Sequence, residues 1–443
     1  MGRGKWDRSG SNPRPVERVE LNERHPLLRL ALVGLLLAIG IGCLIWGLNS
    51  ALTVTVGAEE IETSGTEADC SAAFTVIYEL GKATANRAAV RQMTNIYTEE
   101  AELCYRLFHA YTAFEETENL YTVNHSPNTV LEVDPVLYDA FALMEAMGGR
   151  ALYLGPIYEY SENLFGSGYD TDAAVYDPTR SPDTAAYYAE LLPFIQDENA
   201  VTLTLLGDHR VRLDISEEYL AYGRENGIEV YVGFGPYTNA FIADAIVAAF
   251  TEGGYPDVTV RSGDGFLRSG GTQGKAYTLS LYGRRKGSSV TAAEISFTGP
   301  FAAATYLGYP VETEPEAYAY TYEDGETVTM YVDAADACAK RAVPFLTVYT
   351  RTGTDTALAA AGNFTGGAKS ASGDGYSCAA LALKAAPLYI ADTWDSAAAL
   401  ALRSEGIFAA WCGEDTLLYT EEDLTLENLY TAGEFAFSAR LAR

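Results

Sequence analysis

The sequence predicts an α+β fold with α/β layers, in which a mixed sheet carries flanking helices, preceded by one transmembrane helix. Runs of alternating apolar and polar residues, typical of half-buried strands, begin near residue 200. Helical patterns lie between these runs, and mixed strands and helices of this kind pack as layers. A third observation, an uncharged segment over residues 30–48, predicts the membrane helix.

That segment, LALVGLLLAIGIGCLIWGL, has no charge over 19 residues, close to the ~20 that span a bilayer as a helix. A cleaved signal peptide is the alternative, but its apolar region is shorter, roughly 7–15 residues. Residues 1–29 hold seven Lys or Arg against four acidic residues, and positive flanks stay cytoplasmic. We therefore expect a single-pass protein of the cell membrane: a cytoplasmic basic tail over 1–29, an anchor over 30–48 and an extracytoplasmic domain over 58–443.

The chain is strongly acidic, with 60 Asp and Glu against 30 Lys and Arg and a formal net charge of −30. Such a polyanion repels nucleic acid, so we expect no nucleic-acid partner. HExxH and GxSxG motifs are absent from the sequence, which leaves ordinary hydrolase functions unsupported. Five cysteines follow the anchor, an odd number without a CxxC motif. One or two disulfides are therefore compatible with the sequence, which does not indicate their pairing.

The first part of the exported chain predicts three helices, since apolar residues recur every three or four positions. In the first helix, Leu103, Leu107 and Tyr111 share one stripe. Residues 166–183, rich in Gly, Asp, Thr, Ser and Pro, predict a loop. The helices are expected at residues 78–114, at 135–165 with a break at Gly148–Gly149, and at 183–196.

Strands predominate from residue 200 onward. Residues 200–216 contain two alternating runs around Gly207–Asp208, and Asp324–Gly325 marks a second turn; both dipeptides are typical of hairpins. Residues 239–254 are apolar nearly all round, as a helix buried between layers is. The other strands are expected at residues 228–235, 257–265, 276–283, 289–299, 344–350 and 376–385, and the other helices at 217–225, 355–362 and 388–403.

From residue 103 to 419 the order of these segments resembles the FAD:protein FMN transferase (ApbE) family. The family's ligand loop, Asp-Leu-Gly-Gly-Ile-Ala-Lys-Gly-Tyr-x-x-Asp, aligns without a gap on GFGPYTNAFIAD, where a predicted strand leads into the buried helix. Gly235 and Asp244 match, but Gly233 replaces the Asp and Asn239 replaces the Lys. The resemblance implies that those two family side chains hold the flavin nucleotide, so their charges are missing here.

Earlier and later landmarks are kept in part. ENLYTVN, residues 118–124, takes the place of the family's Ser-Glu-Ile-x-x-Leu-Asn. GGRALYLGPIY keeps Gly155–Pro156 but has Ala151 where the family has Asp. SGDG looks like the family's Gly-Gly-Asp and retains Asp264. The chain therefore keeps the order of the family's landmark motifs but replaces some of their functional side chains.

The last two landmarks concern a histidine and a metal. MYVDAADA is similar to His-Ile-Ile-Asp-Pro-x-Thr-Gly, with Met330 in place of the His and Asp333 kept. ADTWDS aligns on Ala-Asp-Ala-Leu-Ser-Thr, which puts Asp392 and Ser396 at the positions of the metal-binding Asp and Thr. Tyr389 stands where the family has another metal carboxylate. The resemblance thus implies half of a metal site.

The resemblance implies an ApbE-like, T-fold-type domain that binds FAD and Mg²⁺ and transfers FMN to a Thr of a membrane or secreted flavoprotein. The implied flavin-site residues are Gly233, Gly235, Asn239, Asp264 and Asp333, and the implied metal ligands are Asp392 and Ser396. Three functions are open. The substitutions favour a domain with lost or weakened transferase activity that binds a ligand or partner; the alternatives are an active Mg-dependent FMN transferase and a structural or assembly protein of the membrane. Binding of no cofactor is also open.

Several of these residues have structural alternatives to a site role. Asp392 is equally suited to cap a helix, and Ser396 to bond a backbone carbonyl. Asp264 follows a glycine in a predicted turn, where Asp is common without any catalytic duty. Tyr153 and Tyr158 could stack on an isoalloxazine ring, but a chain with 31 Tyr favours packing roles for them.

Overall fold

The computed structural model describes residues 55–65, 70–166, 173–270, 276–311, 318–351, 377–413, 415–432 and 435–443, together with Ile39 and Ile41. The part that begins at Thr55 is one compact unit. The predicted tail over 1–29 and anchor over 30–48 lie outside the described residues, apart from those two isoleucines. No helix among the described residues combines the length and apolar character that a membrane span requires.

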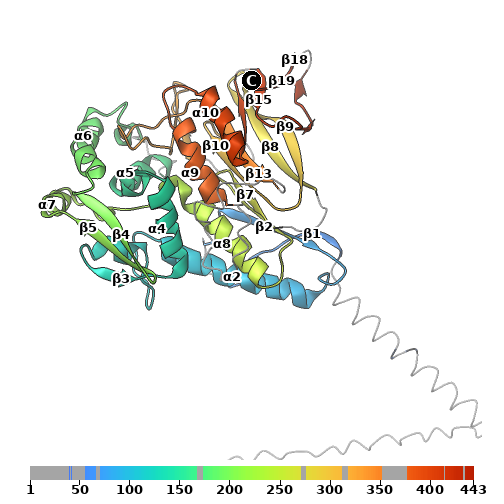
Figure 1. Ribbon diagram of the computed structural model, residues 1–443, viewed down its shortest axis with the longest axis horizontal. Helices are drawn as coiled ribbons and strands as arrows, with labels where there is room; N and C mark the ends of the chain where they lie inside the picture. The colour runs from blue at the N-terminus through green and yellow to red at the C-terminus, as the bar shows by residue number, and fades with distance from the viewer. Residues whose placement is uncertain are drawn as a thin grey trace, which may run out of the picture. The chain divides into compact units, whose positions relative to one another are not determined.

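The centre of the unit is a nine-stranded mixed sheet (Figure 1) in the order β1-β2-β6-β7-β10-β13-β14-β15-β19. Neighbouring strands pair antiparallel, except that β15 and β19 pair in parallel. The strands are β1 (Gly57–Glu60), β2 (Phe74–Leu80), β6 (Val258–Ser262), β7 (Phe266–Ser269), β10 (Phe301–Leu307), β13 (Phe345–Arg351), β14 (Phe408–Cys412), β15 (Thr416–Tyr419) and β19 (Ser438–Leu441).

Helices cover one face of this sheet. α8 (Thr238–Glu252) packs on β6 and β7, and α9 (Cys378–Tyr389) packs on β10 and β13. α2 (Arg87–Phe108) lies against α8 (Figure 1). α8 and α9 are apolar nearly all round because each has strands on one side and a helix on the other.

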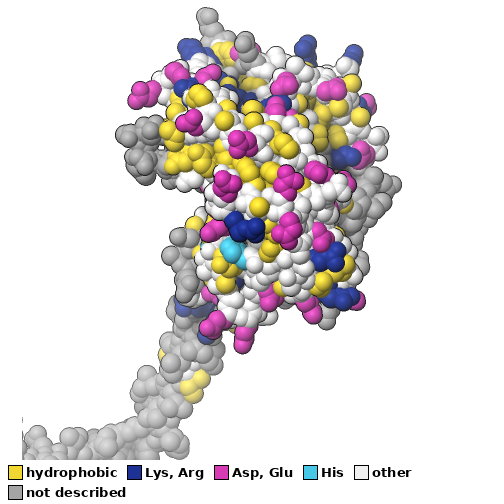
Figure 2. Space-filling model, turned by 90° about the vertical axis from the view of Figure 1, so that its left-hand side faces the viewer, with side chains coloured by type: hydrophobic (Ala, Val, Ile, Leu, Met, Phe, Trp, Pro, Cys, Tyr) yellow, Lys and Arg dark blue, Asp and Glu magenta, His cyan; other side chains and the backbone are white. Residues whose placement is uncertain are grey.

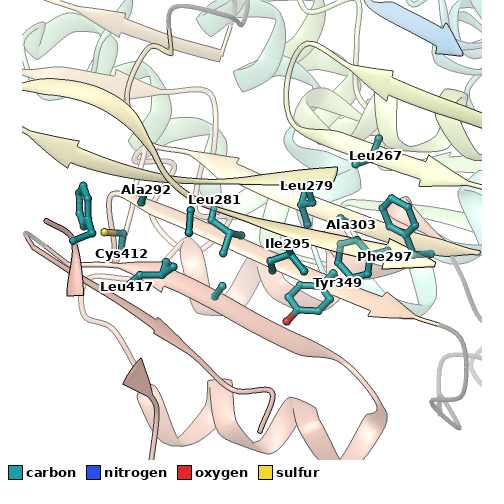
Figure 3. Packing of buried hydrophobic residues seen from close by; sticks show 14 residues of the cluster. Leu267, Leu279, Leu281, Ala292, Ile295, Phe297, Ala303, Tyr349, Cys412 and Leu417 are labelled. Carbon is teal, nitrogen blue, oxygen red and sulfur yellow. The ribbon is translucent and has the colours of Figure 1, made fainter. Parts of the chain in front are cut away.

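A three-stranded sheet in the order β16-β9-β8 covers part of the other face. Its strands are β8 (Ala276–Arg285), β9 (Ser288–Thr298) and β16 (Leu426–Glu427). Leu281 and Ile295 from this layer meet Tyr349 and Leu417 of the large sheet in one buried cluster (Figure 3). Burial of this apolar surface holds the two sheets together, at roughly 25 cal/mol per Å².

Another group of elements forms a helical region around a small sheet in the order β3-β5-β4 (Figure 1). They are α3 (Leu120–His125), β3 (Val130–Glu132), α4 (Pro135–Met147), η1 (Ala151–Leu154), α5 (Gly155–Gly166), η2 (Ala173–Tyr176), α6 (Pro182–Gln196), β4 (Val201–Gly207), β5 (Arg210–Ile215) and α7 (Glu217–Asn226). Acidic side chains are scattered over the face shown in Figure 2.

Many sequence-based predictions are confirmed. The mixed α+β architecture is present, the break at Gly148–Gly149 separates α4 from η1 and α5, and α6, α7 and α8 lie where expected. Asp208 and His209 adopt φ of +49° and +57° in the first predicted hairpin. The Asp324–Gly325 turn joins β11 (Ala319–Thr321) to β12 (Thr327–Thr329).

The prediction of one helix over residues 78–114 is wrong at both ends. The start is strand β2, whose residues alternate between buried and more exposed positions. α2 begins only at Arg87, where the Asn86 side chain accepts a hydrogen bond from the Ala89 amide. It ends at Phe108, so Tyr111 lies outside the helix and is exposed.

The predicted strand over residues 228–235 is also wrong. Its apolar alternation reflects burial, but no partner strand pairs with it among the described residues. The Asn124 side chain takes the partner's role: its Oδ1 accepts from the Tyr231 and Val232 amides, and its Nδ2 donates to the Val232 carbonyl. One buried amide therefore holds an irregular segment in place of a strand.

The predicted strand over residues 376–385 is a helix, α9. Its Ala-rich sequence favours helix, and Ser377 caps it by accepting from the Ala380 amide. The predicted helix over 388–403 is interrupted, since α9 ends at Tyr389 and α10 (Ser396–Ala401) follows. The predicted helix over 355–362 lies outside the described residues. The five described cysteines form no disulfide.

Candidate functional site

The glycine-rich loop joins the irregular segment to α8. The Gly233 amide donates to the Leu152 carbonyl at 2.9 Å. Gly235 has a φ of +49°, and a Cβ there would lie 2.5 Å from the Tyr158 ring, so only glycine fits. Both glycines line a cavity of about 290 Å³ with Tyr158 and Phe108, and neither Asn239 nor Asp264 lines it.

Asn239, at the start of α8, reaches the turn between β6 and β7. Its Nδ2 donates to Asp264 Oδ2 at 2.9 Å, so two of the predicted flavin-site residues lie together. The Oδ1 atom of Asp264 is buried and has no hydrogen-bond partner among the described residues. Burial raises the pKa of Asp264, while the neighbouring Ser262 and Asn239 side chains lower it.

Asp244 has a role that sequence reasoning did not assign. Its buried carboxylate accepts hydrogen bonds from the Ser377 hydroxyl and from the Cys378 and Ala379 amides at the N-terminus of α9, at 2.8–3.0 Å. Burial raises the pKa of Asp244, while Arg268, 3.8 Å away, lowers it. The sequence signal for this role was the match of Asp244 to the last position of the family's loop motif. In the structure its carboxylate joins α8 to the N-terminus of α9.

A group of buried tyrosines lies beside Asp264. The rings of Tyr306 and Tyr331 are 4.9 Å apart, and Tyr389 lies 4.7 Å and 5.4 Å from them. Burial raises the pKa of Tyr331 well above its usual value, and Asp264 adds to the increase. The Tyr389 hydroxyl is buried without a hydrogen-bond partner among the described residues. An aromatic side chain therefore stands where the resemblance expects a metal carboxylate.

Lys340 joins two other predicted site residues. Its Nζ lies 2.8 Å from Asp333 Oδ2, 2.7 Å from Asp336 Oδ2 and 3.3 Å from Asp392 Oδ1. The hydrogen bonds to Asp333 and Asp336 raise the pKa of Lys340. Sequence reasoning missed this lysine, because it matches no family landmark. Tyr331 links the two halves of the site, since its carbonyl accepts from the Lys340 amide at 3.1 Å.

The residues implied as metal ligands do not fit a metal ion as they stand. Asp392 is paired to Lys340, and Ser396 is exposed in the first turn of α10. The cap of α10 is Asp395, not Asp392: its Oδ1 accepts from the Ala397 and Ala398 amides. In the part of the chain that the structure describes, no three His, Cys, Asp or Glu side chains are placed to hold a metal. Mg²⁺ prefers an octahedron of oxygens without an ammonium among them.

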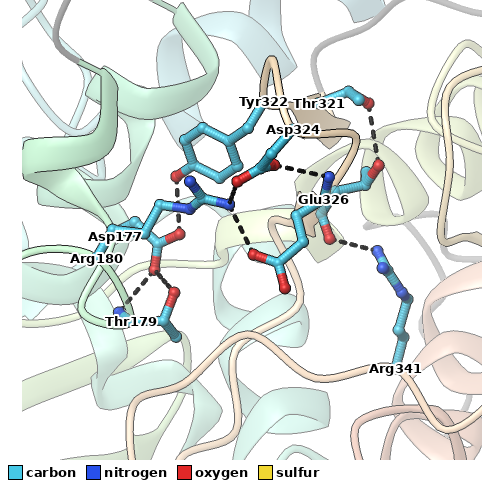
Figure 4. A network of polar contacts seen from close by, with 9 residues as sticks. Asp177, Thr179, Arg180, Thr321, Tyr322, Asp324, Glu326 and Arg341 are labelled. Carbon is cyan, nitrogen blue, oxygen red and sulfur yellow. Dashed lines mark hydrogen bonds and ion pairs between the residues drawn. The ribbon is translucent and has the colours of Figure 1, made fainter.

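Polar contacts with Arg180 and Asp177 fix the β11–β12 hairpin (Figure 4). Arg180 Nη2 pairs with Asp324 Oδ2 at 2.8 Å and Glu326 Oε2 at 2.6 Å, and its guanidinium lies 3.6 Å from the Tyr322 ring centre. Tyr322 donates to Asp177 at 2.7 Å. These residues line a cavity of about 520 Å³ together with Lys340.

Comparison with solved structures identifies the fold. The flavin transferase ApbE from Vibrio cholerae superposes with a TM-score of 0.50 at 15% identity, over 84% of this chain and 98% of that one. The fold is that of ApbE. The ApbE protein of Thermotoga maritima gives a TM-score of 0.48 at 14% identity, over 84% and 96% of the two chains. No protein-family model and no curated protein sequence matches the chain.

Proposed function

We propose that this chain is a membrane-anchored, extracytoplasmic domain of the ApbE fold that binds a ligand at Asn239 and Asp264 and lacks metal-dependent FMN transfer. The observation that carries the proposal is the buried Asp264 Oδ1, which has no hydrogen-bond donor among the described residues. A buried polar group without a partner costs about 1–3 kcal/mol. A site that retains such an atom is expected where a ligand supplies the donor.

The ligand is expected to be uncharged where it meets this site. Lys340 is already paired with three carboxylates. Arg341 is engaged as well, because its Nη1 donates to the Gly308 and Thr327 carbonyls at 2.9 Å and 2.6 Å. A pyrophosphate group would therefore meet more negative than available positive charge here. An isoalloxazine ring is neutral and has an imide N–H that suits Asp264.

The residues around Lys340 also argue against metal-dependent transfer. A divalent ion would offset phosphate charge during attack by the target hydroxyl. Asp392 instead pairs with Lys340, and Tyr389 replaces a carboxylate. Loss of one group that stabilises transition-state charge costs about 10²–10³ in rate in other enzymes. If the N-terminal segment anchors the chain, the partners of the domain are membrane or secreted proteins.

Titration of the full chain in detergent micelles with riboflavin and with FAD tests the proposal. We expect riboflavin to bind more tightly than FAD, and millimolar Mg²⁺ to leave both affinities unchanged. Replacement of Asp264 by Ala should weaken riboflavin binding at least 10-fold, whereas Asp208→Ala, at a 93% exposed side chain, should not. Mg²⁺-dependent FAD binding would favour the active transferase. Binding of neither flavin would overturn the ligand site and favour a structural or assembly role.

A further inference from the structure

β8 is an edge strand of the three-stranded sheet. It pairs with β9 along its whole length, and no strand among the described residues pairs with its other side. Every second residue of such a strand directs its N–H and C=O groups away from the sheet. Over residues 277–281, up to the register shift between Leu281 and Tyr282, no hydrogen bond joins these groups to another described element. This half of β8 therefore offers an unpaired backbone edge.

The other edges of the three larger sheets are protected in ways that this half of β8 is not. Natural proteins blunt sheet edges with charges, short strands or covering groups. β1 holds two glutamates and β19 an arginine, while β3 and β16 are three and two residues long. Backbone groups of β4 are bonded by side chains: Arg150 donates to the Val201 carbonyl, and the Leu203 amide donates to the Tyr153 hydroxyl. Residues 277–281 contain neither a charge nor a proline.

A groove with a volume of about 340 Å³ runs along this edge. The four consecutive β8 residues 277–280 all line it. Because successive side chains of a strand point to opposite faces, a cavity that touches all four lies beside the strand edge. The facing wall consists of side chains from β2, β6, β7 and β10, among them Ile77, Thr259, Phe266 and Leu307. The groove thus separates the unpaired edge from a part of the large sheet.

A single extended peptide is the occupant that this groove fits. Unpaired strand edges recognise the main chain of a peptide by strand addition, and an added strand would lie about 4.8 Å from β8. It would cover Ile77, which is 38% exposed on the large sheet. One acidic and one basic residue, Glu79 and Arg261, line the groove, so it favours no net charge. The edge of a second folded copy would bring its own sheet, for which about 340 Å³ leaves no space.

We propose that β8 and this groove bind an extended, uncharged segment of a partner protein, which adds a fourth strand to the three-stranded sheet. Alternate apolar side chains of the segment pack on the large sheet, and its backbone pairs with β8. The site is separate from the proposed ligand site, because neither Asn239 nor Asp264 lines the groove.

The test is titration of the full chain in detergent micelles with a fluorescein-labelled peptide of sequence TVTVTV, followed by fluorescence anisotropy. Two N-methylated forms, with methyl groups on the threonine or on the valine amides, distinguish strand addition from apolar adsorption. An antiparallel added strand bonds β8 through the N–H groups of alternate residues. We expect saturable binding of the parent peptide and of one methylated form, and at least 10-fold weaker binding of the other.

Hydrogen exchange followed by mass spectrometry locates the bound peptide. Saturation should slow exchange over residues 277–281, whereas β4, whose backbone groups are bonded by Arg150 and Tyr153, should not change. Ile77→Lys should weaken peptide binding at least 10-fold, because it places a charge on the apolar wall of the groove. Val130→Lys is the matched control, since Val130 is a 47% exposed strand residue outside the groove.

If Ile77→Lys does not fold, Thr278→Lys, at an exposed position of β8 in the groove, replaces it in the same assays. Equal binding of the two methylated forms would refute the inference. Absence of saturable binding at millimolar peptide, or unchanged exchange over residues 277–281, would also refute it. None of these outcomes depends on the flavin titration, so the two proposals stand or fall separately.

Discussion

Asn124→Ala should destabilise the domain more than its small change in volume suggests. The Asn124 side chain is 2% exposed and bonds the Tyr231 and Val232 amides and the Val232 carbonyl at 2.8–3.0 Å. Alanine would leave these three buried backbone groups without partners, at ~1–3 kcal/mol for each group that stays unsatisfied. Because the segment can relax in part, we expect a loss of about 3–5 kcal/mol.

Urea unfolding of the full chain, followed by fluorescence of Trp394 and Trp411, measures this loss. Asn226→Ala is the control, because Asn226 is exposed and its Nδ2 bonds only the Tyr222 carbonyl of its own helix. Its expected effect is within about 0.5 kcal/mol. Equal effects of the two substitutions would show that the Asn124 bonds do not hold this segment in place.

Three further predictions follow from single contacts. Asp244→Asn should cost about 2–4 kcal/mol in urea unfolding, because one buried carboxylate serves three donors at the start of α9; a loss below 1 kcal/mol would contradict this. Gly235→Ala should lower the melting temperature more than Gly227→Ala, since both glycines have positive φ but only Gly235 lies against a ring; equal shifts would exclude the clash. Burial raises the pKa of Glu100 to about 7 from 4.5, so the folded state holds this proton more tightly and stability falls as pH rises from about 4.5 to 7. In Glu100→Gln, melting temperatures measured from pH 4.5 to 7 should no longer show that part of the stability loss. A pH profile identical to the wild type would show that Glu100 is not the titrating group.

Local sequence signals predict the elements whose determinants are local. The hairpins at Gly207–Asp208 and Asp324–Gly325 follow from turn chemistry, and α6 begins at Pro182 behind the Ser181 cap. Residues 228–235 and 376–385 fail for the opposite reason. The first segment is held by Asn124, 107 residues earlier. The second begins at its own cap, Ser377, but its first amides and the Ser377 hydroxyl also bond to Asp244, 133 residues before Ser377. An apolar run buried on all sides does not reveal which partner completes its hydrogen bonds.

The candidate site likewise contains residues that the sequence indicates and residues that only the folded structure reveals. Asn239 and Asp264, which the resemblance indicates as site residues, are hydrogen-bonded to each other, and Asp333 and Asp392 both pair with Lys340. The cation itself, Lys340, has no signal in sequence, because a lysine near acidic residues is ordinary on an acidic surface. Its position depends on how two distant loops pack, and only the folded chain shows that.

The most direct test of the account is mass spectrometry of a Thr-containing acceptor after incubation with the full chain, FAD and Mg²⁺. We expect no FMN adduct, because Asp392 is paired with Lys340 and because Gly233 and Asn239 stand where the resemblance places charged side chains. An adduct that appears with the wild type, disappears with EDTA and disappears with Asp392→Ala would contradict it. Such a result would establish a working metal-dependent transferase at this site.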